Sequence, residues 1–144
     1  MARTYNQDFF EPKNPEKYLS GKKIFYKSAW ELTVMRMLDE KSSILAWQSE
    51  PFTIYYLNPL TKKWKPYIPD FFVIYENKKG QKNAEVWELK PMTQTGLVEA
   101  KTRYDRAQVV INQAKWSYAV QWCSRKGYRF RVITENDIYR QKKK

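Results

Sequence analysis

Two carboxylates and a lysine are the residues of this sequence whose types and spacing favour chemistry. Asp70 follows a proline in one apolar segment, and Glu88 and Lys90 lie in a second. Because side chains alternate between the two faces of a strand, Glu88 and Lys90 would project from the same face. Two carboxylates facing each other destabilise a sheet, since like charges repel across a strand pair. The same two carboxylates are suitable ligands for a divalent cation.

The two segments that carry these residues are predicted to form a β-hairpin. The connecting loop, 76–82, contains Asn-Lys-Lys-Gly-Gln, which is turn chemistry with a glycine available for positive φ. If the hairpin is symmetric about Lys79, Asp70 lies directly across from Glu88. The alternative interpretation is an edge hairpin whose charged side chains form a solvated face.

The composition favours a polyanionic partner. Among 144 residues, 27 Lys and Arg outnumber 15 Asp and Glu, which gives a net charge of +12. This excess favours salt-dependent, sequence-independent binding of nucleic acid. We expect no membrane partner, because no apolar run has the length of a membrane span and no basic amphipathic helix with a lipid-facing side stands out. The sequence shows no exposed-aromatic pattern for base stacking, which ranks an RNA-binding role below a DNA-binding one.

Residue types that are rare or absent narrow the chemistry further. There is no histidine, which excludes Ser-His-Asp and Cys-His nucleophilic sites and histidine-ligated zinc. Carboxylates, lysine, tyrosine or activated water must therefore do any acid–base work. The single cysteine, Cys123, is expected to be a small buried side chain, and its lack of a partner within the chain suits a reducing compartment.

The hydrophobic periods predict an α/β (α+β) domain with the element order α, β, β-hairpin, α, β. Its sheet is expected to be mixed and flanked by helices. A helix is predicted over 28–40, with Ser28 as its N-cap and Glu31 three residues later. The other elements predicted beside the hairpin are a strand over 43–57 broken at Pro51, a helix over 97–126 ended by Gly127, a strand over 128–133 and a helix start at 134–137.

Glu31 has two interpretations, which the sequence leaves open. In a capping box, its carboxylate reaches back to the backbone amide of Ser28. Alternatively, it supplies a third acid to the patch of Asp70 and Glu88. Both can hold, because an acid in the first turn of a helix points out from the helix N-terminus, where a metal site can lie.

The long predicted helix has an apolar stripe and a basic flank. The stripe is expected to face the sheet, and a kink is expected near Asn112 because an unbroken helix would span about 45 Å. On the flank, Gln113 and Lys115 are the candidates for a functional role, since we expect both to project from one side of the helix. The stripe comprises Leu97, Ala100, Tyr104, Ala107, Ile111, Ala114 and Tyr118, and the flank also includes Lys101, Arg103 and Arg106.

Residues 1–27 are predicted to be an arm that packs its aromatic side chains onto the single domain formed by residues 28–144. Pro12 and Pro15 interrupt the arm, and no hydrophobic period holds along it. Its lysines give it a basic face, which is either a solvated segment or a DNA contact.

The motif residues and several longer stretches resemble a known family. Pro69-Asp70 followed by Glu88-Leu89-Lys90 resembles the PD-(D/E)xK motif of restriction-endonuclease-like nucleases. A wider set of stretches, which keep their order and are spread over most of the chain from Phe10 to Trp116, resembles the tailed-phage head-completion nucleases of that superfamily. These stretches are Phe10-Glu-Pro-Lys-Asn-Pro-Glu-Lys-Tyr18, Tyr26-Lys-Ser-Ala-Trp-Glu31, Ile68-Pro-Asp-Phe71, Glu88-Leu-Lys-Pro91 and Asn112-Gln-Ala-Lys-Trp116.

This resemblance implies the αβββαβ core of the superfamily, dependence on Mg²⁺ with Mn²⁺ as an alternative, and hydrolysis of phosphodiester bonds in double-stranded DNA. Carried over by position, Asp70 and Glu88 would be metal ligands, and Lys90 would orient or activate water. Glu31 would be the acid borne by the helix and a further metal ligand. Gln113 or Lys115 would support the site from the second helix. Apart from the resemblance, Lys101 and Arg103 on the flank of that helix are further candidates for DNA binding.

The resemblance also implies a role at head completion, in which packaged phage DNA is trimmed or cleaved before tail joining. The expected partners are double-stranded DNA and phage portal or neck proteins. The expected locations are the host cytoplasm during assembly and the virion head or neck. The main alternative is a non-enzymatic DNA-binding head or neck protein that keeps the nuclease motif as a relic.

Overall fold

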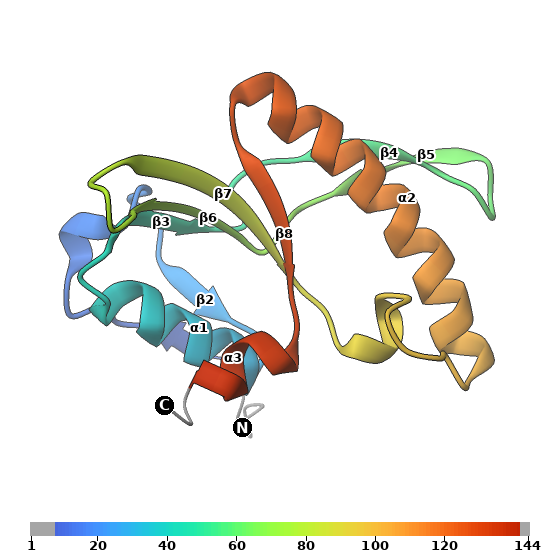
Figure 1. The fold of residues 1–144 in the computed structure, drawn as a ribbon, viewed down its shortest axis with the longest axis horizontal. Coiled ribbons are helices and arrows are strands. Elements are labelled where there is room, and N and C mark those ends of the chain that lie inside the picture. The colour runs from blue at the N-terminus through green and yellow to red at the C-terminus, as the bar shows by residue number, and fades with distance from the viewer. Residues whose placement is uncertain (1–7, 142–144) are drawn as a thin grey trace.

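The computed structural model of the protein describes residues 8–141, so that residues 1–7 of the expected arm and the lysines at 142–144 lie outside the described residues (Figure 1). Its central sheet consists of β3 (Ile44–Ser49), β6 (Phe71–Glu76), β7 (Lys82–Leu89) and β8 (Arg129–Ile133). The four strands are ordered β3-β6-β7-β8. β6 is antiparallel to β3 and to β7, whereas β8 is parallel to β7, so the predicted mixed sheet is confirmed.

Three helices accompany this sheet: α1 (Ala29–Glu40), α2 (Arg103–Lys126) and α3 (Glu135–Gln141). Two further antiparallel strand pairs are β1 (Asp8–Phe10) with β2 (Ile24–Tyr26), and β4 (Ile54–Asn58) with β5 (Lys63–Tyr67). The short 3₁₀ turns are η1 (Pro15–Lys17) and η2 (Met92–Gln94). α1 and α3 lie together on one side of the sheet (Figure 1). α2 lies on the other side, next to the β4–β5 hairpin.

Two hydrophobic clusters hold these layers together. The larger lies between the sheet, α1 and the N-terminal segment, where Trp47, Phe71 and Met35 are fully buried. The smaller includes Ile54 and Ala119 and lies between α2 and the β4–β5 hairpin. As a result, α2 and the β4–β5 hairpin form one packed unit beside the sheet.

The central hairpin has the predicted register. The side-chain oxygen Oδ1 of Asn77 accepts hydrogen bonds from the N–H groups of Lys79 and Gln81, both at 2.9 Å. Gly80 adopts a φ of 78°, which a residue with a side chain rarely takes. The pairing of β6 with β7 is symmetric about Lys79, as the turn residues predicted.

The strand predicted over 43–57 is wrong as a single element. This segment forms β3 and β4 in different sheets, because the chain turns between them where Glu50 has a φ of 47° and Pro51 follows. β4 instead pairs with β5, a strand that the sequence analysis missed. β5 alternates lysine with Trp64 and Pro66, but a proline inside such a short run disfavours a strand, and every residue of β5 except Tyr67 is exposed.

The long helix begins later than predicted. Thr102 is its N-cap, with Oγ1 accepting a hydrogen bond from the N–H of Asp105 at 2.9 Å, and Gly96 in the preceding loop has a φ of 87°. α2 then continues through Asn112 without the expected break, spans about 36 Å, and ends at Gly127 as predicted. Neither α2 nor another helix in the described part of the chain is long and apolar enough to cross a membrane.

The apolar stripe predicted for this helix is wrong at its N-terminal end. Leu97 precedes the helix and is 73% exposed, and Tyr104 is 65% exposed. The buried positions of α2 are instead Asn112, Ala119 and Cys123, and the burial of Cys123 confirms its expected place in the core. The C-terminal half of the stripe is confirmed, because Ile111, Ala114 and Tyr118 pack on the smaller core. Leu97 and Ala100 fall outside the helix because Thr102 caps it after them.

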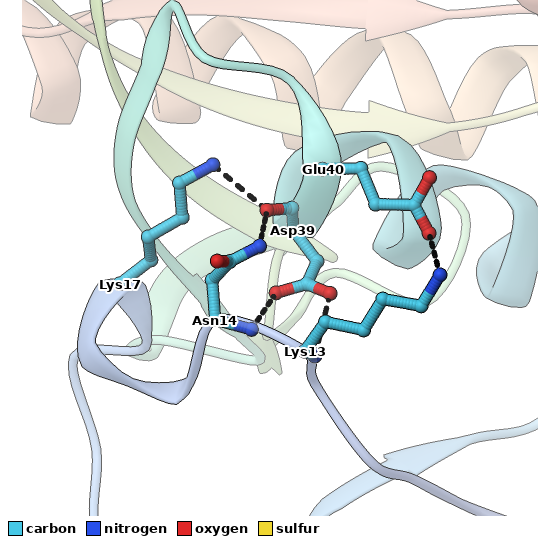
Figure 2. A network of polar contacts seen from close by, with 5 residues as sticks. All are labelled: Lys13, Asn14, Lys17, Asp39 and Glu40. Carbon is cyan, nitrogen blue, oxygen red and sulfur yellow. Dashed lines mark hydrogen bonds and ion pairs between the residues drawn. The ribbon is translucent and has the colours of Figure 1, made fainter.

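An acidic residue at the end of α1 ties the N-terminal segment to the domain (Figure 2). Asp39 is 1% exposed, and its carboxylate accepts hydrogen bonds from the backbone N–H groups of Lys13 at 2.8 Å and Asn14 at 2.9 Å. The ammonium group of Lys17 donates to the Asp39 carbonyl at 2.8 Å and so covers the C-terminus of the helix. An acid here would otherwise be disfavoured by the helix dipole, and these donors offset that cost.

We predict that Asp39→Ala lowers the free energy of unfolding by about 2 kcal/mol, because two partly buried backbone N–H groups lose their acceptor. Urea denaturation followed by circular dichroism measures this change. The matched control is Glu40→Ala: its ion pair with Lys13, at 3.5 Å, joins two exposed side chains and should contribute less than about 0.5 kcal/mol. Equal unfolding midpoints for the two variants would contradict the prediction.

Candidate active site

The ends of β6 and β7 bring the two predicted carboxylates together. Asp70 immediately precedes β6, and its backbone N–H donates to the carbonyl of Trp87 at 3.1 Å. Its side chain turns back onto β7, where Oδ2 accepts a hydrogen bond from the N–H of Leu89 at 2.7 Å. These two bonds hold Asp70 beside Glu88, although the ladder between β6 and β7 ends at Phe71 and Trp87 and does not include the predicted pair itself.

Burial and mutual repulsion make this pair unfavourable as two free anions. Glu88 is 4% exposed, and burial raises its pKa above the usual value of a glutamate. Burial, followed by the charge of Glu88, raises the pKa of Asp70 to about 8, and the Leu89 N–H only partly opposes this shift. A proton or a cation between the two carboxyl groups would therefore relieve a real cost.

Two lysines from different elements face the carboxylate pair. The Lys90 ammonium lies 3.6 Å from Oε2 of Glu88. Lys115 comes from α2, and its ammonium lies over the rings of Tyr56 and Tyr67, at 5.7 and 5.5 Å from their centroids. Lys115 is half-buried, and burial, followed by repulsion from Lys90, lowers its pKa, whereas the charges of Glu88 and Asp70 oppose this shift.

Tyr67 is a member of the site that the sequence analysis missed. Its hydroxyl donates a hydrogen bond to Oε1 of Glu88 at 2.9 Å. Burial, followed by the charge of Glu88, raises the pKa of Tyr67, so the hydroxyl keeps its proton and stays a donor. The sequence signal was weak, because Tyr67 ends the unpredicted strand β5.

Glu31 lies at the edge of the site and also takes part in the cap of α1. The Ser28 hydroxyl accepts a hydrogen bond from the Glu31 N–H at 3.0 Å, which confirms the predicted N-cap. The carboxylate of Glu31 accepts from the N–H of Lys27 at 2.6 Å, one residue earlier than the capping box predicted. The charge of Glu31 also contributes to the raised pKa of Asp70, after burial and the charge of Glu88.

The donor set fits a hard cation held by two carboxylates. Within residues 8–141, no three Asp, Glu, Cys or His side chains converge as a metal site, so Glu31 stands beside the pair of Asp70 and Glu88 and not within it. Mg²⁺ commonly takes one or two protein carboxylates and completes its shell with water and substrate phosphate. The two oxygen-bearing side chains, buried and repelling each other, are suited to that role.

Three other candidates lie outside this group. The structure contradicts the expectation that Gln113 and Lys115 project from one side of the helix, because residues two apart are separated by about 200° around its axis. Gln113 is exposed and lies against Gly96 in the loop before α2. Its amide nitrogen would be 2.9 Å from a Cβ atom added at Gly96, so it packs on that loop. Lys101 and Arg103 are exposed at the N-terminal end of α2.

Comparison with known proteins agrees with this geometry. The family described as TnsA-like endonuclease N terminal matches residues 41–135, which include Asp70, Glu88 and Lys115 but not Glu31. Over 138 residues the chain is 30% identical to a head completion nuclease of Enterobacteria phage T4, an alignment that covers 88% of this chain and 89% of that protein. The chain therefore belongs to the TnsA-like endonuclease N-terminal family, which is restriction-endonuclease-like in fold.

Proposed function

We propose that this protein is a metal-dependent deoxyribonuclease that hydrolyses phosphodiester bonds in double-stranded DNA. The observation that carries the proposal is the buried pair of Asp70 and Glu88, faced by two lysines, in a fold of endonucleases. The net charge of +12 supports a polyanionic substrate.

The side chains of the site divide the work between them. Asp70 and Glu88 would hold Mg²⁺, or Mn²⁺ in its place, and the hydroxyl of Tyr67 orients Glu88 for this task. The bound ion would neutralise charge on a phosphate oxygen and act as a Lewis acid. Lys90 would place positive charge where negative charge develops on the phosphate. Glu31 adds negative potential that attracts the cation.

We further propose that the substrate is packaged phage DNA, cleaved at head completion before tail joining. Support comes from the similarity, over most of both chains, to a head completion nuclease of a phage. On this proposal the protein meets portal or neck proteins, first in the host cytoplasm during assembly and then in the virion head or neck.

Cleavage of plasmid DNA with and without Mg²⁺ tests the proposal, and Asp70→Asn is the decisive variant. We predict that the parent cleaves only with Mg²⁺ and that the variant does not cleave. Without Mg²⁺ the variant should melt at the same or a higher temperature, because the repulsion between Asp70 and Glu88 is gone. It should also gain less stability than the parent when Mg²⁺ is added.

Glu76→Gln is the matched control for this variant, since it removes one exposed negative charge from the same hairpin and should leave cleavage unchanged. Cleavage by Asp70→Asn would refute the assignment of Asp70 as a metal ligand. A large loss of stability without metal would instead mean that Asp70 has a structural role.

Glu31→Gln separates the two roles of Glu31. Glutamine keeps an oxygen that can accept the Lys27 N–H but removes the charge next to Asp70. We predict that cleavage falls at least about tenfold, with little change in melting temperature. Ser28→Ala is the control: it removes the cap, should cost about 1 kcal/mol of stability, and should keep cleavage activity. Full activity of the glutamine variant would leave the cap as the only role of Glu31.

Tyr67→Phe tests whether the tyrosine positions Glu88. We predict that cleavage falls about 10- to 100-fold and that half-maximal activity requires more Mg²⁺, because Glu88 loses the donor that orients it. Tyr75→Phe provides a matched control, since it removes a similar hydroxyl bond, to Glu85 at 2.8 Å, from the same sheet. If both variants behave like the parent, Tyr67 contributes no more than packing.

A further inference from the structure

The lysines of strand β5 project from a single face of the β4–β5 hairpin. Lys63, Lys65 and Tyr67 are each two residues apart, so their side chains point to the same side of the strand. Both lysines are exposed, whereas Tyr67 is buried. The opposite face of the hairpin has no lysine and carries Tyr55, Leu57, Trp64 and Pro66.

A lysine of α2 lies on the same face of the hairpin. Lys65 is directly opposite Tyr56 in the strand pair, and opposite residues point to the same side. The Lys115 ammonium lies over the ring of Tyr56 at 5.7 Å and over the ring of Tyr67 at 5.5 Å. Lys63, Lys65 and Lys115 therefore form one surface, the lysine face, which has Tyr67 at one end.

No acidic side chain of the hairpin or of the facing part of α2 balances these charges. Residues 51–69 and residues 106–134 contain no Asp or Glu. Among the residues that the structure describes, Lys63, Lys65 and Lys115 form no ion pair. Like charges on one patch repel one another, so the lysine face is unfavourable by itself and favourable against a polyanion.

The lysine face leads into the candidate active site. The hydroxyl of Tyr67 contacts Glu88, and the charge of Glu88 also acts on Lys115. Along β5, Lys65 lies about 7 Å and Lys63 about 14 Å from Tyr67. The longer distance is the axial length of about four base pairs. A duplex whose scissile phosphate lies at the carboxylate pair can therefore reach both lysines.

We propose that the DNA duplex on one side of the cleavage position lies with its phosphates along the lysine face, where Lys63 and Lys65 bind the backbone. This inference rests on the proposed nuclease function and adds the path that the DNA takes away from the carboxylate pair. Lys115 binds a phosphate between the scissile one and those at β5. Phosphate oxygens supply the anions that the three ammonium groups lack, and such contacts are independent of base sequence.

The salt dependence of duplex binding tests this path. Full-length protein binds a dye-labelled blunt duplex in a chelator, so that no cleavage occurs, and fluorescence anisotropy gives the affinity from about 50 to 200 mM salt. The double variant Lys63→Ala/Lys65→Ala should bind about tenfold more weakly at the lowest salt. Its plot of log affinity against log salt should be shallower by about 1.8, since each phosphate contact contributes about 0.9. Lys63→Arg/Lys65→Arg should keep most of the affinity.

Lys78→Ala/Lys79→Ala is the matched control. It removes the same two charges from an exposed turn, which joins β6 and β7 at their opposite end from Asp70. This control should keep the affinity within about twofold and the salt slope of the parent. Equal changes in the two alanine variants would overturn the proposal in favour of an effect of net charge alone. An unchanged slope in Lys63→Ala/Lys65→Ala would also overturn it.

A cleavage assay with Mg²⁺ separates this inference from the nuclease proposal. Lys63→Ala/Lys65→Ala should need about tenfold more DNA than the parent for half-maximal cleavage, in line with its weaker binding. If the parent does not cleave DNA but the salt slope depends on Lys63 and Lys65, the nuclease proposal fails and the lysine face stands. If cleavage depends on Asp70 but binding does not depend on Lys63 and Lys65, the lysine face fails and the nuclease proposal stands.

Discussion

Two carboxyl groups buried next to each other at the end of the central hairpin are the constraint on which the site depends. Burial raises the pKa of both Asp70 and Glu88, and the charge of Glu88 makes ionisation of Asp70 harder still. The surrounding structure opposes this cost with the Leu89 N–H, the Tyr67 hydroxyl and the Lys90 ammonium. The arrangement is costly for a sheet by itself and favourable for one that binds a cation and a phosphate.

The site lies where separate packing units meet. The sheet supplies Asp70 and Glu88, and α1 brings Glu31 close from the larger core. The unit of α2 and the β4–β5 hairpin supplies Tyr67 and Lys115 from the smaller core. The geometry at the carboxylates therefore depends on how this second unit packs beside the sheet, and a loosened smaller core would disturb the site without removing a single charged group.

Local patterns in the sequence were enough to predict the central part of the fold. The turn residues around Gly80 determine the hairpin register, and alternation along the strands then places Glu88 and Lys90 on one face. Ser28 and Gly127 mark helix ends by chemistry that needs only neighbouring residues. The grouping of Asp70, Glu88 and Lys90 therefore follows from local patterns alone.

By itself, the sequence determined the central hairpin and its acidic pair, because short-range hydrogen bonds and strand alternation encode them. The order of the elements indicated a mixed sheet, and the resemblance of the motifs indicated the nuclease family. Only the tertiary structure decided that Tyr67 holds Glu88, that Lys115 and not Gln113 faces the site, and that Trp64 is exposed. These features arise from the packing of α2 against the β4–β5 hairpin. Such contacts join residues far apart in the chain, and no local period or cap records them.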